Sequence, residues 1–394
     1  MNYFIKIFFS IILYCTFVFP QSKNLTNISN KGFFLNFLFF NDSTTYITVH
    51  FPANYLIFNK VADTYIANYS LELIFQNFKK EQILSLSKEN VLHLENENYQ
   101  TRNDFFVNLF FNNYNLKNAQ FCKIILSQNN SSLSEIDYKI TPSKFLVGKL
   151  SDSLFILSNL GNLIPFSANS YDLLLDATFF SDTLTLQQGN KLITFNNLPI
   201  IYLYNQINEK NKSLIIQTNQ QSNNRYYLIK NFNQLFFEGV VNIKDQKNNS
   251  TNINVFWYNK PLSLKNISFA IEKLSLLFNK DDIDKLIKSD SIKYSFFQAW
   301  KKYDNDTNTS FNPMLEEFYR RVDFSIKNFS TLSVKDGSET DMGKIYILYG
   351  PPTNKERILL TNKKTIEIWK YNNIKKSFTF EDNSGLGNFK LVTK

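Results

Sequence analysis

The sequence predicts a mainly β protein with a C-terminal α+β domain: two immunoglobulin-like β-sandwiches, then a helical segment and a small antiparallel sheet. Three observations predict this architecture. Apolar and polar residues alternate along many short segments before residue 260. The apolar spacing becomes helical after Pro261. Finally, Gly337, Gly343 and Gly350 fall within a short C-terminal window of a chain that holds only 10 glycines.

The N-terminus predicts export. Lys6 precedes an apolar run at residues 7–19, and Pro20 follows that run. These flanks are typical of a signal peptide, and the run is short for a membrane-spanning helix, so we expect residues 1–20 to be removed. An uncleaved anchor is the alternative. The mature protein is expected in the periplasm, at the outer membrane or outside the cell, with no transmembrane segment.

The number of cysteines and the distribution of charge each exclude one feature. Removal of the signal would leave Cys122 without Cys15, which excludes an intrachain disulfide, and the apolar run FCKIIL predicts a buried thiol. The formal net charge is +9, but the lysines are interspersed with acidic residues and no nucleic-acid motif occurs. The sequence therefore indicates a solvated basic surface and no nucleic-acid partner.

Strand-type alternation places the two sandwiches at residues 30–142 and 143–260. In the first, apolar residues occupy alternate positions at residues 65–75 and 105–111. In the second, the alternation resumes at residues 171–179, and the last strand, NINVFWYNK, ends before Pro261.

Residues 261–394 are predicted to form the α+β domain. Helical spacing recurs in SLKNISFAIEKLSLLFN and KYSFFQAWKKYD. Asn312 is expected to cap a further helix, since Pro313 follows it. Strands are predicted at residues 344–349 and 367–371, and SFTFED and FKLV are predicted to form a closing hairpin.

The stretch DGSETDMGKIYILYGPPTN, residues 336–354, predicts a turn that leads into the first of these strands. Gly337 is expected to take a positive φ, and Thr340 and Asp341 are expected to bond to nearby backbone amides. Gly343 would then open the strand.

The end of the same strand is predicted from its last residues. Tyr349 is followed by Gly350, Pro351 and Pro352. Two prolines cannot continue a β-ladder, because each lacks the amide hydrogen that the ladder needs. The strand is therefore expected to stop abruptly at Gly350.

These C-terminal segments resemble a known family. FFQAWKKYD, FYRRVDFSIKNFS, DGSETDMGKIYILYGPP and EIWKY are similar to the GWxTD domain of secreted proteins from Bacteroidota and related bacteria, over about residues 290–394. Ser338 stands where the family has a tryptophan, and Met342 stands where a basic residue is usual. The resemblance implies a domain and an exported compartment, and it implies no reaction.

Two interpretations of the charged residues in this domain are open. In the first, Arg320 or Arg321 pairs with Asp341 as a bidentate ion pair beside Trp369, and the motif is structural. In the second, the same residues and Glu367 line a groove for a protein or a glycan. A catalytic form of the second uses Asp341 and Glu367 in glycoside hydrolysis, which needs carboxyl groups roughly 5–9 Å apart.

The sequence lacks the residue patterns of other common functional sites. His50, expected at a strand edge, and His93, expected on a surface strand, belong to no metal-ligand pattern. No phosphate-binding loop, dinucleotide fingerprint or nucleophile elbow occurs. No metal and no cofactor are therefore predicted.

The sequence favours a non-enzymatic, exported interaction protein of the cell envelope or the extracellular space, which binds an envelope protein or a glycan. The alternative is a carboxylate-dependent, glycan-active enzyme centred on the C-terminal domain. The residues assigned to a binding or structural motif are Arg320, Arg321, Gly337, Thr340, Asp341, Gly343, Tyr349, Gly350, Pro351, Pro352, Glu367 and Trp369.

Overall fold

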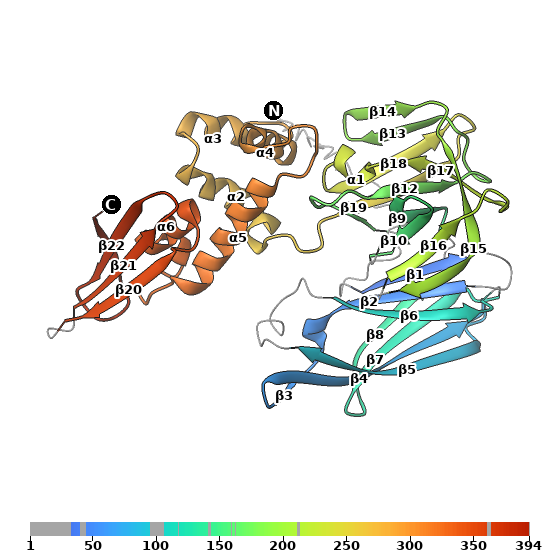
Figure 1. Cartoon of the computed structure of the whole chain (residues 1–394), viewed down its shortest axis with the longest axis horizontal. Coiled ribbons are helices and arrows are strands. Elements are labelled where there is room, and N and C mark those ends of the chain that lie inside the picture. Colours follow the sequence, from blue (N-terminus) through green and yellow to red (C-terminus); the bar gives the residue numbers. More distant parts are fainter. Residues whose placement is uncertain are drawn as a thin grey trace, which may run out of the picture.

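The computed structural model describes residues 33–39, 45–94, 106–116, 118–140, 143–158, 160–161, 163–210, 213–360 and 364–393. The predicted signal peptide and Cys15 lie outside these ranges. Several sheets are followed by helices and a small antiparallel sheet, which confirms the predicted fold class. Figure 1 shows the β regions, blue to yellow-green, beside the orange helices and the red C-terminal sheet. No helix in the described ranges is long and apolar enough to cross a membrane.

The first β region is a sandwich of two sheets. Its strands are β1 (Phe34–Phe39), β2 (Thr45–Pro52), β3 (Asn59–Val61), β4 (Thr64–Gln76), β5 (Gln82–Leu94), β6 (Phe106–Tyr114), β7 (Phe121–Gln128) and β8 (Ser131–Lys139), with the short helix η1 (Ala53–Tyr55) after β2. One sheet has the order β1-β2-β6; the other has the order β3-β4-β7-β8, with β5 paired to β4. Alternate residues of the facing strands, such as Leu71 and Leu73, fill the core between them.

Strand β2 is buried on both of its faces. All eight of its residues are buried. Ile47 and Val49 belong to the sandwich core, whereas Tyr46 packs into the core of the second β region. The Tyr46 hydroxyl accepts a hydrogen bond from the Ile207 N–H at 3.4 Å. β2 therefore joins the two β regions.

The cysteine and histidines of the first β region have different environments. Cys122 is buried as predicted, and burial raises the pKa of its thiol. His93 is exposed on β5, but His50 is completely buried within β2 and not at an edge. Among the described residues, no group of three or more His, Cys, Asp or Glu could hold a metal ion.

The second β region combines a barrel and a sheet. Its elements are β9 (Phe145–Ser151), β10 (Leu154–Leu157), β11 (Ile164–Pro165), β12 (Asp172–Asp176), β13 (Leu184–Gln188), β14 (Lys191–Phe195), β15 (Ile200–Lys210), β16 (Ser213–Thr218), β17 (Asn224–Ile229), α1 (Phe232–Leu235), β18 (Gly239–Asp245) and β19 (Ser250–Phe256). The strands β10-β16-β15-β17-β12-β9 close into a barrel, and β11-β19-β18-β13-β14 form a five-stranded sheet. A register shift within β15, between Leu203 and Ile207, bends the strand that closes the barrel.

The helices follow Pro261, as the change in apolar spacing predicted. They are η3 (Leu262–Lys265), α2 (Ile267–Lys273), η4 (Leu274–Leu276), α3 (Lys280–Ile287), α4 (Ile292–Trp300), η5 (Lys301–Tyr303), α5 (Pro313–Asn328), η6 (Gly337–Glu339) and α6 (Asp341–Tyr349). The Asn312 side chain caps α5 by accepting a hydrogen bond from the Leu315 N–H at 3.0 Å. This is the cap predicted from the Asn-Pro pair.

One hydrophobic core crosses the predicted boundary at residue 260. The Phe166 ring lies 5.2 Å from Trp257, 5.1 Å from Phe311 and 6.2 Å from Phe297, measured between ring centroids. Phe166 and Trp257 precede Pro261 in the chain, and Phe297 and Phe311 follow it. The sheet and the helices therefore share one packed interior, although the element type changes between them.

The C-terminal sheet packs one face against α6. Its strands are β20 (Asn354–Leu359), β21 (Thr365–Tyr371), β22 (Lys376–Asp382) and β23 (Lys390–Thr393), in that order across the sheet. Trp369 and Phe380 form a core with Met342 and Ile345 of α6. The predicted strand at 367–371 and the predicted closing hairpin are confirmed as β21, β22 and β23.

The strand predicted at residues 344–349 is wrong, because this segment belongs to helix α6. Gly343 accordingly lies inside the helix and opens no strand. The run IYILY favours a strand by its residue types. However, Met342, Ile345 and their neighbours bury a helical face against the sheet, and tertiary packing overrides the local preference.

Candidate functional site

The motif at residues 336–354 lies where α5, η6 and α6 meet. A Cβ added at Gly343 would collide with the Gly337 carbonyl oxygen, and one added at Gly337 would collide with the Ser325 carbonyl oxygen of α5. Backbone atoms cannot rotate away, so only glycine fits at both positions. Gly337 is not among the glycines with a positive φ, contrary to the prediction. The two glycines allow close backbone packing.

Thr340 and Asp341 begin α6. The Thr340 hydroxyl accepts a hydrogen bond from the Gly343 N–H at 3.0 Å and donates one to the Gly337 carbonyl at 2.7 Å. Asp341 occupies the first turn, where the helix dipole favours a carboxylate. Its Oδ2 accepts a hydrogen bond from the Leu391 N–H of β23 at 2.9 Å. Asp341 therefore ties the helix to the sheet.

The predicted pairing of Asp341 with Arg320 or Arg321 is wrong. Arg320 donates to Glu316 Oε1 at 2.6 Å. Arg321 donates to Glu317 Oε1 at 2.8 Å. In both pairs the carboxylate lies one turn earlier on α5, so each arginine meets a partner on its own helix.

The residues after α6 end the helix and connect it to the sheet. Gly350 has a φ of 77°, which favours glycine at the end of a helix. The Tyr371 hydroxyl donates to the Gly350 carbonyl at 2.9 Å, and the Tyr349 and Tyr371 rings lie 5.8 Å apart. Pro351 and Pro352 follow, and neither can continue a helix with full hydrogen bonding.

The side chains of Trp369 and Glu367 form a hydrogen bond with each other. Trp369 is 0% exposed, and its ring packs 5.0 Å from Phe380. Its indole N–H donates to Glu367 Oε1 at 2.7 Å. Glu367 and Asp341, the two candidate catalytic carboxylates, each accept a hydrogen bond from a donor within the fold.

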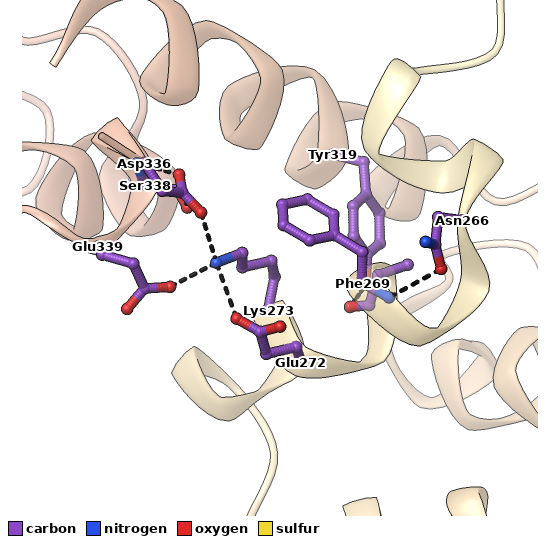
Figure 2. A network of polar contacts seen from close by, with 9 residues as sticks. Asn266, Phe269, Glu272, Lys273, Tyr319, Asp336, Ser338 and Glu339 are labelled. Atoms are coloured by element: carbon purple, nitrogen blue, oxygen red, sulfur yellow. Dashed lines mark hydrogen bonds and ion pairs between the residues drawn. The ribbon is translucent and has the colours of Figure 1, made fainter. Parts of the chain in front are cut away.

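A lysine network beside the motif was not predicted from the sequence. Lys273, only 3% exposed, extends from α2 toward three carboxylates (Figure 2). Its Nζ lies 2.8 Å from Asp336 Oδ2 and 3.1 Å from Glu272 Oε1, and it also contacts Glu339. Burial alone would lower the pKa of Lys273, but these carboxylates raise it overall. A lysine held so firmly in its charged form is a structural cation and a poor nucleophile.

Ser338, at the position of the family tryptophan, belongs to the same network. It is 2% exposed, and its hydroxyl donates to Asp336 Oδ1 at 2.6 Å. Burial would raise the pKa of Asp336, but the bonds from Lys273 and Ser338 lower it overall. The serine therefore helps to hold the carboxylate that binds Lys273.

A cleft opens elsewhere, between the five-stranded sheet and the helices. It has a volume of about 910 Å³, which is within the range of small-molecule sites. Its walls come from the β13–β14 turn at residues 188–191, from residues 237–238 just before β18, from α4 and from the loop at residues 307–310. None of the twelve motif residues lines it.

Aromatic rings form one wall of the cleft. Phe237 stacks on Phe297 at 5.5 Å and meets Tyr294 edge to face at 5.8 Å. The Tyr294 side chain is 52% exposed. The Gln188 amide donates to the Phe237 carbonyl at 2.7 Å and accepts from its N–H at 3.0 Å, which fixes the β13–β14 turn to this wall.

Lysines outnumber carboxylates among the residues that line the cleft. Lys191 donates to the Leu235 carbonyl at 2.5 Å. Burial, and then the charge of Lys301, lower the pKa of Lys191. Lys293 lies 3.3 Å from Glu238.

Sequence reasoning missed the cleft, because its walls are far apart along the chain. One signal was present in the run KYSFFQAWKK, residues 293–302. Helical spacing places Tyr294, Phe297 and Lys301 on one face.

Comparison with known families identifies the C-terminal part of the chain. Residues 239–393 match the GWxTD domain family. The match includes the region recognised from its motifs and begins earlier, at the first residue of β18. It contains the α4 wall of the cleft but not the β13–β14 turn. No curated protein matches the chain.

Proposed function

We propose, from the premise that residues 239–393 form a GWxTD domain, that this is an exported, non-enzymatic interaction protein of the cell envelope or the extracellular space. Its ligand is an envelope protein or a glycan. The observation that carries the proposal is the cleft of about 910 Å³, with Tyr294 exposed on its aromatic wall. An exposed aromatic ring in a concave, partly polar site is typical of a binding surface.

The hydrogen bonds and ion pairs of the motif residues favour a binding function over catalysis. Asp341 bonds to the backbone of β23, and Glu367 bonds to the Trp369 indole. A general acid or a nucleophile must instead be directed at a substrate. The two arginines are likewise bonded to carboxylates on their own helix.

The binding test uses the mature chain and two matched tyrosine variants. A glycan array and purified envelope proteins are screened, and each ligand found is measured by calorimetry with Tyr294→Ala and Tyr204→Ala. Tyr204 is 45% exposed but lies on barrel strand β15, outside the cleft. We expect Tyr294→Ala to weaken binding at least about tenfold, as expected for a central aromatic contact, and Tyr204→Ala to leave it unchanged.

Other outcomes of this test would change the proposal. Equal affinities of the two variants would show that the ligand binds outside the cleft. Release of new reducing ends from a bound glycan would favour the carboxylate-dependent enzyme.

Export has a separate test. Cells are fractionated, and the N-terminus of the recovered chain is sequenced. We expect it near residue 21, because the apolar run at residues 7–19 ends at Pro20. Full-length chain in the cytoplasm would contradict the proposal.

A further inference from the structure

The charges at the cleft do not balance. Four ammonium groups lie at the cleft or bond to its lining carboxylate: Lys191, Lys260, Lys293 and Lys301. Within the part of the chain that the structure describes, two carboxylates pair with them. Glu238 is shared by Lys260 at 2.8 Å and Lys293 at 3.3 Å, and Asp304 pairs with Lys301 at 2.8 Å.

Of these four lysines, Lys191 is the one that forms no ion pair with a described carboxylate. Its Nζ bonds to the neutral Leu235 carbonyl and lies 5.6 Å from the centre of the Phe236 ring. Among the described residues, no ion pair joins Lys191 to a carboxylate. Asp306, in the loop that forms the far wall, accepts a hydrogen bond from the Asn308 N–H at 3.0 Å and does not line the cleft. Lys191 is exposed, so its ammonium can be reached by an anion that binds beside it.

The other lining groups match a saccharide. Tyr294 and Phe237 offer apolar ring surface, and Asn190, Gln298 and Asn308 are exposed polar amides at the cleft. Amides both donate and accept hydrogen bonds, as sugar hydroxyl groups require. Rings of this kind give the contact area that a sugar ring can cover.

The placement of the β-hairpin favours a saccharide over an extended peptide. A peptide that adds to a sheet needs an open strand edge along its path. The β13–β14 hairpin instead presents its turn to the cleft, through Gly189 and Asn190. The ladder groups of the β14 edge run along Lys191–Phe195, and only Lys191 among these residues lines the cleft.

We propose that the cleft binds a carboxylated saccharide, with the sugar carboxylate at Lys191 and a sugar ring against Tyr294. The proposal rests on the proposed binding function and specifies its ligand class. Because burial and Lys301 lower the pKa of Lys191, a bound carboxylate would also raise that pKa.

The test compares charged and neutral forms of the same sugars. Trimers of galacturonic, glucuronic and mannuronic acid, and their methyl esters, are titrated into the mature chain by calorimetry. The ester keeps the ring and hydroxyl groups and removes only the charge. We expect at least one acid trimer to bind about tenfold or more tightly than its ester, with an affinity that falls as salt is added.

Matched lysine variants locate the carboxylate. Lys191→Gln removes the ammonium and keeps a polar side chain; Lys244→Gln does the same at an exposed position farther along β18. We expect Lys191→Gln to remove the preference for the acid over its ester and Lys244→Gln to retain it. Circular dichroism and the thermal midpoint show whether either variant is misfolded.

The remaining outcomes separate this inference from the proposed function. Equal binding of acid and ester, lost in Tyr294→Ala, would overturn the inference and keep the cleft as a glycan site. Binding of poly-glutamate but of no trimer, sensitive to Lys191→Gln, would overturn the saccharide assignment in favour of an acidic protein. Binding of neither class, together with an empty screen, would overturn both proposals.

Discussion

The motif region (residues 336–352) and the cleft differ in what their side chains contact. In the motif region, Thr340 and Asp341 form hydrogen bonds with backbone groups of the fold. In the cleft, Tyr294 is exposed and Lys191 bonds to a neutral carbonyl. The more recognisable sequence therefore builds the scaffold, and ordinary residues from distant segments build the better candidate site. Substitutions in the motif region should change stability, and those in the cleft should change binding.

The largest effect is expected from Gly343→Ala. The added Cβ would collide with the Gly337 carbonyl oxygen, a backbone atom, so α6 and η6 must move apart. We expect a loss of about 3 kcal/mol in the free energy of unfolding, measured by denaturant titration. Gly387→Ala is the control, since no atom lies within 4 Å of its added Cβ and only its φ of 83° is strained. Equal losses in both variants would contradict the close-packing explanation.

The next effect is expected from Lys273→Met, which removes the cation between Asp336, Glu272 and Glu339. The buried pair with Asp336 would lose its partner, and the more exposed Glu339 would be rehydrated. We expect a loss of about 2 kcal/mol, below the usual cost for a fully buried pair. Lys344→Met on α6, which is outside this network, should change the free energy of unfolding far less.

The same network predicts a specific pH dependence. Because the folded pKa of Asp336 is lowered, its contribution to stability is present above the unfolded value of about 3.9 and is lost as pH falls through the folded pKa. Acid titration of the free energy of unfolding should therefore show a steeper decrease below about pH 4 in the native chain than in Lys273→Met. Parallel curves would contradict the ion pair.

A smaller effect is expected from Asp341→Ala. The change removes a carboxylate from the first turn of α6 and its bond to the Leu391 N–H. We expect a loss of about 1 kcal/mol. An ion pair with an arginine would instead cost about 3–5 kcal/mol, so denaturant unfolding separates the two interpretations.

The smallest stability effect is expected in the cleft. Tyr294→Ala should change the free energy of unfolding by less than about 0.5 kcal/mol, because the side chain is 52% exposed. A loss above 2 kcal/mol would show that Tyr294 is a packing residue and would remove the contrast with the motif region.

The sequence predicted elements better than it predicted pairings between them. Alternation located β4, and the Asn312-Pro313 pair located the start of α5, because both signals are local. The strand predicted for IYILY was wrong. Contacts with Trp369 and Phe380, which lie later in the chain, place this β-prone run on a helix. Barrel closure depends on pairing β9 with β10 and β12, which no local pattern encodes.

The candidate site shows the same limit. The arginine pairing failed because Glu316 and Glu317, one turn away, are nearer partners than Asp341. That competition was visible in the sequence as i,i+4 spacing. The cleft was not visible, because residues 188–191 meet α4 only through the tertiary fold.

Because β2 is buried on both of its faces, its tolerance to substitution should differ from that of β4. On β4, buried residues alternate with exposed or partly buried ones from Ala67 to Gln76, so tolerance to charged substitutions should rise and fall with every second residue. On β2, all eight residues are buried, since the sandwich occupies one face and the barrel the other. A mutational scan should therefore show periodic tolerance along β4 and uniform intolerance along β2, and selection should preserve the joint between the two β regions as strictly as either core.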